Sequence, residues 1–135
     1  MDRFAALQRE LKEEVELFQQ VQQEIAKNQG VMQQFLQQQH ENEMVAKELD
    51  LNQEEDAVYK LIGPALIKQD LEEAKSNVAK RLEFIATELN RLEDKLKSLE
   101  EKRARKQSQI MRLQKEAQEL QQRHLKQQQQ RVAAA

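Results

Sequence analysis

Apolar residues recur at alternating intervals of three and four along the first 50 residues of the chain. Ten of the 14 positions in this pattern are apolar, and the polar exceptions are Glu14, Asn28, Gln39 and Asn42. A seven-residue repeat kept this long is typical of a coiled-coil seam, and an asparagine in the seam can fix helix register. The spacing predicts one long helix over residues 1–50, with its seam at positions 4, 7, 11, 14, 18, 21, 25, 28, 32, 35, 39, 42, 46 and 49.

The same repeat resumes at Leu71 and predicts a second long helix over residues 71–126. Asp70 stands just before it and Glu73 follows three residues later, which is a variant of the capping box at a helix start. Twelve of the 15 seam positions are apolar, at 71, 75, 78, 82, 85, 89, 92, 96, 99, 103, 106, 110, 113, 117 and 120. The remaining residues 127–135 are rich in Gln and Ala, and their low complexity predicts a disordered tail.

Between the two helices, residues 51–70 have a different character. Asn52 is expected to end the first helix, and Pro64 cannot lie inside a helix without losing a hydrogen bond and clashing with the preceding turn. Two short apolar runs rich in β-forming residues flank Gly63 and Pro64, and they predict a β-hairpin with a tight connection. Apolar side chains fall on both faces of these strands, so the hairpin is expected to need cover on both sides.

The predicted fold class is mainly α, an antiparallel two-helix coiled coil joined by a single β-hairpin. The distribution of charge supports a chain that folds back on itself. Residues 1–56 carry 5 basic and 13 acidic side chains, whereas residues 102–135 carry 9 basic and 2 acidic ones, so the two segments attract each other when they lie side by side. Internal complementarity is therefore favoured over nucleic-acid binding as the reason for the basic segment. If the chain folds back at the hairpin, Glu14 and Lys106 come together, which predicts an ion pair that explains both breaks in the seam.

The composition favours an extended helical protein over a compact globular one. Charged residues make up 34% of the chain, aromatic residues 4%, and Cys and Trp are absent. The absence of Cys removes disulfide and thiolate chemistry, and no apolar run approaches the roughly 20 residues needed to span a bilayer. These features lead us to expect a soluble, cytoplasmic protein with no membrane partner.

Catalytic and cofactor-binding patterns are not found in the sequence. Neither glycine belongs to a phosphate-binding loop, and His40 and His124 would lie far apart in an antiparallel hairpin. The basic run at residues 102–106 resembles a nuclear-localisation cluster, but adjoining acidic residues and its place in the helix favour a structural role. We therefore expect no enzymatic activity, no cofactor, no metal and no nucleic-acid partner.

The hairpin suggests how the chain works, because an isolated two-stranded hairpin is only marginally stable in water. Its free edges invite pairing with other chains, and several hairpins can close into an intersubunit β-barrel that has no edges. The residues expected to carry this assembly are Val58, Tyr59, Leu61, Ile62, Gly63, Pro64, Ala65, Leu66 and Ile67.

The opposite ends of the two helices carry a second candidate surface. Apolar seam residues there would form an exposed lining if the helices fray, and such a lining could hold non-native chains by burying apolar surface. Ordinary seam packing is an equally good interpretation of the same residues. The seam residues concerned are Phe4, Leu7, Leu11, Leu113, Ala117 and Leu120, and Leu125 follows just beyond the seam as a further predicted contact residue at this end.

The segment from Val58 to Gln69, followed by Leu71-Glu72-Glu73-Ala74 and by Lys80-Arg81-Leu82-Glu83-Phe84-Ile85, closely resembles the β-type prefoldin subunits. The likeness covers the chain as helix, hairpin and helix, and its specific part lies at residues 58–85. The resemblance implies a heterohexamer of two α-type and four β-type subunits whose hairpins form a double β-barrel. It also implies ATP-independent capture of unfolded proteins such as actin and tubulin at the coiled-coil tips, with transfer to the cytosolic group II chaperonin.

A coiled-coil scaffold or tether that binds one folded partner is the alternative function. The hairpin separates the two hypotheses, because a tether does not need a non-helical apolar segment in the middle of the chain.

Overall fold

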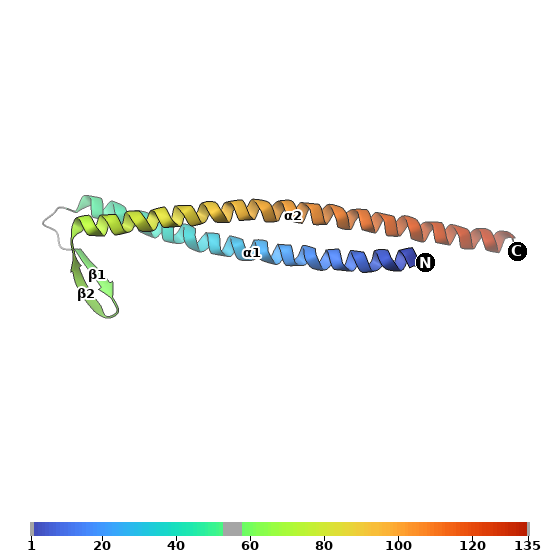
Figure 1. Ribbon diagram of the computed structural model, residues 1–135, viewed down its shortest axis with the longest axis horizontal. Helices are drawn as coiled ribbons and strands as arrows, with labels where there is room; N and C mark the ends of the chain where they lie inside the picture. Colours follow the sequence, from blue (N-terminus) through green and yellow to red (C-terminus); the bar gives the residue numbers. More distant parts are fainter. Residues whose placement is uncertain (1, 53–57, 135) are drawn as a thin grey trace. The chain divides into compact units, whose positions relative to one another are not determined.

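Two long helices and one β-hairpin make up the part of the chain that the structure describes, residues 2–52 and 58–134 of a computed structural model (Figure 1). This arrangement confirms the predicted fold class. The intersubunit barrel involves other chains and stays a prediction, and residues 53–57 of the predicted assembly segment lie outside the described residues. The elements follow one another as α1 (Asp2–Leu51), β1 (Val58–Ile62), β2 (Ala65–Gln69) and α2 (Leu71–Ala134).

The inner ends of the helices lie where the sequence predicts them. Helix α1 ends at Leu51, and the backbone N–H of Asn52 donates a 3.2 Å hydrogen bond to the carbonyl of Leu49. Helix α2 begins after Asp70, whose carbonyl accepts a 2.9 Å hydrogen bond from the N–H of Ala74. Asp70 therefore occupies the N-cap position, since its carbonyl accepts the first hydrogen bond of the helix.

The C-terminal segment differs from the prediction. Residues 127–134, expected to be a disordered tail, continue α2 as far as Ala134. Gln, Arg and Ala are good helix formers, and no Gly or Pro interrupts the segment, so elongation of an existing helix costs little there. Low sequence complexity alone therefore did not indicate where the helix ends.

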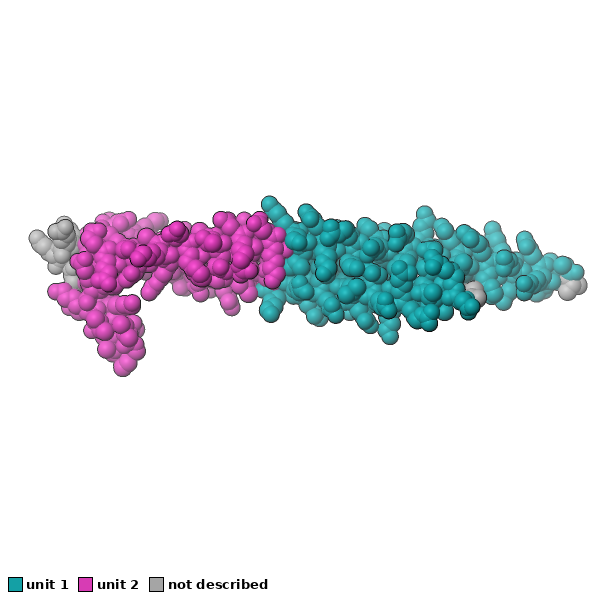
Figure 2. Space-filling view, in the orientation of Figure 1, with its two compact units in different colours: residues 1–27, 96–135 teal, residues 28–95 magenta. Residues whose placement is uncertain are grey.

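The described chain divides into two compact units, which are coloured separately in Figure 2. Unit 1 comprises residues 1–27 and 96–135, and unit 2 comprises residues 28–95. Within each unit the first helix packs antiparallel against the second along the predicted seam. All 14 seam positions of α1 and all 15 of α2 are buried or half-buried, which confirms the seven-residue pattern.

Unit 2 has its apolar core next to the hairpin. Leu49, Leu71, Ala74 and Val78 are buried together, and the half-buried Val58 of β1 packs against them. Ala74 is buried although the seven-residue pattern assigns the neighbouring Lys75 to the seam. A small side chain fits close to the opposite helix, and the lysine stem remains half-buried beside it.

The hairpin is antiparallel, with Ile62 paired to Ala65 at its tip and Val58 paired to Gln69 at its base. Gly63 and Pro64 form the two-residue connection, and Gly63 has a φ of 58°. A positive φ at the first central residue is the requirement of a type II′ turn, which glycine meets without steric cost. The turn thereby fixes the register of the two strands.

Candidate functional site

The hairpin exposes most of the residues predicted to carry subunit assembly. Of the nine, only Val58 is half-buried within the chain, and Gly63, Pro64 and Ala65 are exposed in and beside the turn. The five large apolar side chains are each about half exposed or more: Tyr59 (56%), Leu61 (68%), Ile62 (52%), Leu66 (67%) and Ile67 (49%).

The exposed apolar side chains lie on both faces of the hairpin. Leu61 and Leu66 are directly paired across the strands and share one face, whereas Ile62 and Ile67 lie on the other, because successive side chains of a strand point to opposite faces. Fully burying a side chain of this size is worth about 1.5–3 kcal/mol relative to leaving it exposed. Cover on both faces would therefore stabilise the hairpin strongly, and a two-stranded sheet cannot supply that cover by itself.

The residues predicted at the coiled-coil tips are packed together in unit 1. Leu7, Leu113 and Ala117 are buried in one cluster, and the partly buried side chains packed against it are Phe4, Leu11 and Leu120. Of the seven predicted contact residues, only Leu125 is exposed. The structure thus places six of them in ordinary seam packing, and contact with an unfolded chain would require the two helices to separate here.

Two polar contacts tie the helices together in unit 1. The Lys106 ammonium lies 3.0 Å from one carboxylate oxygen of Glu14 and donates a 3.3 Å hydrogen bond to the other. This confirms the predicted pairing of the two charged breaks in the seam. Nearer the tips, Arg3 donates a 2.7 Å hydrogen bond to Glu116, and this contact and the accompanying charge attraction raise the pKa of Arg3 above its ordinary value.

Unit 2 contains a polar contact between the helices that was not predicted from the sequence. Asn28 is 4% exposed, and its side-chain amide donates a 3.0 Å hydrogen bond to the backbone carbonyl of Leu92 in α2. The interruption of the seam at Asn28 was the available signal, but a backbone acceptor on the other helix cannot be recognised from side-chain types.

Sequence reasoning also gave no role to apolar residues that lie off the seam in unit 2. Phe84 is 60% exposed, with its ring edge-on to that of Phe35 at a centroid distance of 6.5 Å. Leu36, Met44 and Val45 of α1 are exposed too. Large apolar residues at positions outside the seven-residue pattern were the signal in the sequence that could have pointed to these exposed side chains.

Neither a metal site nor a membrane span is found among the described residues. No group of three or more His, Cys, Asp or Glu in residues 2–52 and 58–134 is arranged to hold a metal ion. Across the same ranges, neither helix contains a stretch apolar enough and long enough to cross a bilayer.

Comparison with known proteins identifies the family. Residues 12–117 match the model of the prefoldin subunit family, and the chain belongs to that family. The fold agrees, because the prefoldin beta subunit from Thermococcus strain KS-1 superposes with a TM-score of 0.70. That match has 22% sequence identity and covers 75% of this chain and 89% of the other.

Within the family, the chain is similar to proteins named prefoldin subunit 6. It is 38% identical to the human protein over 87 residues, which is 64% of this chain and 67% of that protein. The Arabidopsis thaliana relative is 64% identical over 53 residues, and this match spans 39% of this chain and 41% of the relative. The resemblance of the chain to β-type prefoldin subunits, and to subunit 6 among them, is confirmed. Prefoldin subunits are non-enzymatic chaperone components, so the prediction that the chain is not an enzyme is confirmed as well.

Proposed function

We propose that this chain is one subunit of a hexameric prefoldin co-chaperone, with two α-type and three further β-type subunits as its partners. The complex captures unfolded proteins such as actin and tubulin in the cytoplasm without ATP and passes them to the group II chaperonin. The observation that carries the proposal is the hairpin, which exposes five large apolar side chains on a sheet of only two strands. Such a sheet gains stability by pairing with other hairpins, because assembly covers its faces and its edges.

The two proposed working surfaces have different requirements. Assembly uses the hairpin residues from Val58 to Ile67 in the conformation described above. Client and chaperonin contact at the tips uses the cluster around Leu7 and Leu113, which is buried until the helix ends separate. Helix ends open more easily than helix centres, so the ends of α1 and α2 are suited to transient exposure.

Co-expression with α-type and β-type prefoldin subunits tests the proposal. The mass of the purified complex, measured by native mass spectrometry, is expected to correspond to a hexamer that contains this chain. A chain that remains monomeric, or that forms only a homodimer beside its candidate partners, contradicts the proposal and favours the tether. A matched variant with Leu61→Ser and Leu66→Ser is expected to keep its helices, because neither residue belongs to a helix core cluster, and to lose the hexamer.

A further inference from the structure

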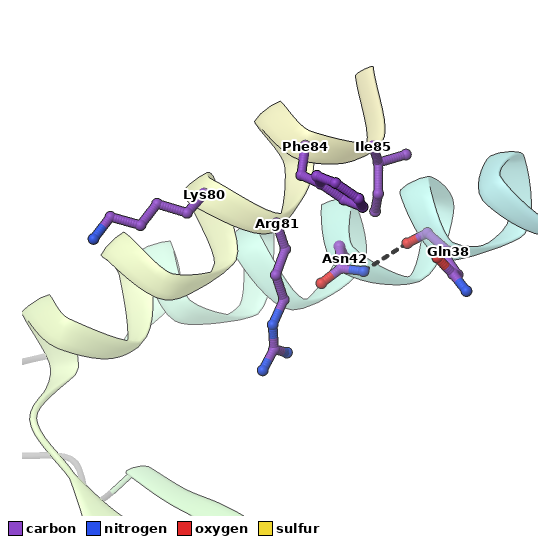
Figure 3. Close-up of a pocket in the computed structure, with 6 residues that line it drawn as sticks. All are labelled: Gln38, Asn42, Lys80, Arg81, Phe84 and Ile85. Atoms are coloured by element: carbon purple, nitrogen blue, oxygen red, sulfur yellow. Dashed lines mark hydrogen bonds between the residues drawn. The ribbon is translucent and has the colours of Figure 1, made fainter. Parts of the chain in front are cut away.

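A groove runs along one side of unit 2, where β1 lies beside the two helices. It consists of two neighbouring depressions of about 310 and 280 Å³, and Arg81 lines both of them. The first lies between α1 and α2 and is shown in Figure 3, where Phe84 and Ile85 lie above Asn42 while Lys80 and Arg81 extend away from α2. The second continues toward the hairpin between Val45, Leu49 and Val78 of the helices and the residues of β1.

The groove is basic in a chain that is slightly acidic as a whole. Its lining includes Lys60, Lys80 and Arg81 and contains no acidic residue, although the chain has 24 acidic and 22 basic residues. None of the acidic side chains in the described part of the chain lies within ion-pair distance of these three cations. Among the described lining residues, an occupant with carboxylates would therefore meet positive charges and no negative one.

The apolar part of the groove suits an occupant that also carries apolar side chains. Phe84 and Val45 are 60% and 46% exposed, and both lie on the groove although neither is a seam residue. Isolated exposed apolar residues need no explanation, but here they line a hollow next to the exposed Tyr59 and Leu61.

The strand side of the groove favours an extended occupant. Four consecutive residues of β1, from Val58 to Leu61, line the second depression, whereas β2 contributes Gln69 alone. Side chains of consecutive strand residues alternate between faces, so a surface that touches four in a row lies along the strand edge. Among the described residues β1 pairs only with β2, and its outer edge can accept backbone hydrogen bonds from an added segment.

We propose that this groove binds an acidic, partly apolar segment of a neighbouring prefoldin subunit, and that Arg81 selects the neighbour by its charge. The inference rests on the proposed function, because it needs the assembled complex. It extends that function from the hairpin to the helices beside it. Carboxylates of the segment pair with Arg81 and Lys80, and its apolar side chains cover Phe84 and Val45. The groove thereby discriminates among subunits whose hairpins alone are similar.

Photo-cross-linking within the co-expressed complex tests which segment lies in the groove. A benzoylphenylalanine replaces Phe84, and a control carries it in place of Lys95, which is exposed on the same helix and lies outside the groove. Peptide mapping is expected to find the cross-link from position 84 in an acidic segment of a partner subunit, and none from position 95. An assembled hexamer that gives no cross-link from position 84, or only cross-links to basic segments or to an added client, overturns the inference.

Charge reversal tests the role of Arg81 as a specificity residue. Arg81→Glu is expected to lower incorporation into the hexamer at least tenfold in competition with the unchanged chain. Arg81→Lys should retain most of the incorporation, and the matched reversal Lys47→Glu, on an exposed site of unit 2 outside the groove, should leave it unchanged. Circular dichroism and thermal unfolding are expected to be the same for all four chains, because Arg81 is exposed and belongs to no core cluster.

The outcomes separate this inference from the proposed function. A hexamer that forms equally well with Arg81→Glu and with Lys47→Glu overturns the role of Arg81 and leaves the co-chaperone function intact. A failure of the unchanged chain to assemble overturns both.

Discussion

Single polar side chains interrupt the apolar seam of the helices, and three of them, Glu14, Asn28 and Lys106, meet a partner on the opposite helix. Glu14 pairs with Lys106 in unit 1, and Asn28 donates its hydrogen bond to the carbonyl of Leu92 in unit 2. A buried polar group without a partner costs about 1–3 kcal/mol, so a shift of register along either helix would be penalised at both sites. We therefore expect these residues to help fix the register of the two helices.

The Glu14–Lys106 pair leads to a prediction about stability. Both side chains are only about 20% exposed, so breaking the pair leaves a poorly solvated charge. Glu14→Lys and Lys106→Glu alone are each expected to lower the free energy of unfolding by about 1–3 kcal/mol, and the exchanged double variant to recover most of the loss. Urea unfolding of the four chains measures the coupling.

The same exchange at Arg3 and Glu116 serves as the control for an exposed pair, since those side chains are 63% and 42% exposed. Coupling there is expected to stay below about 1 kcal/mol. Equal losses in both single variants and in the double variant of Glu14 and Lys106 would show that the contact does not contribute to register.

At the scale of elements, the hairpin depends on its turn. Gly63 has a positive φ, and a Cβ added at this position would meet no atom within 4 Å. The requirement for glycine is therefore conformational and does not arise from crowding. A residue with an L-configured side chain pays about 1–2 kcal/mol to adopt a left-handed conformation.

Gly63→Ala is accordingly expected to weaken assembly about 5- to 30-fold while the helical circular dichroism stays unchanged. The helices retain their core clusters, in which the turn takes no part. The measurement is the midpoint of hexamer formation in a dilution series by native mass spectrometry. A D-alanine at the same position, introduced by semisynthesis, should restore assembly because it favours positive φ. Loss of assembly with both residues would contradict a purely conformational cause.

At the scale of the whole molecule, the large apolar side chains divide into buried seams and exposed surface. The seams hold the clusters at Leu7, Val21 and Leu49, whereas five exposed groups lie on the hairpin and others are spread along the outer faces of both helices. Assembly therefore has a surface that is ready in the isolated chain. The proposed client capture at the tips differs, because six of its seven predicted contact residues are packed in the seam and become accessible only if the seam opens.

Locking the tips tests whether this opening is needed. The chain has no cysteine, so Leu7→Cys with Leu113→Cys places one new thiol on each helix within the same buried cluster. The oxidised variant is expected to assemble normally and to lose most of its suppression of aggregation of chemically denatured actin, measured by light scattering. Reduction should restore this activity, because it frees the helix ends.

A second pair, Val21→Cys with Leu99→Cys, locks another part of the same unit and is the matched control. It should retain client capture in both redox states. Full activity of the oxidised pair at residues 7 and 113 would place client contact on another surface.

The two helices, the break between them and the hairpin can all be predicted from the sequence. These features follow from short-range rules: a seven-residue apolar period, a proline that ends a helix, and a glycine and proline between two β-forming runs. The sequence also predicts the Glu14–Lys106 pair, since folding at a known turn places two matching breaks opposite each other. Its error at residues 127–134 arose from treating low complexity as disorder, where helix propensity favoured continuation of α2.

The contacts and surfaces between the elements, in contrast, are visible only in the folded chain. The closed packing around Leu7 and Leu113, the backbone acceptor of Asn28 and the basic groove at Arg81 each join residues that are far apart in the chain. No local pattern encodes such a surface, because the side chains that line it come from different elements and acquire common neighbours only when those elements pack together.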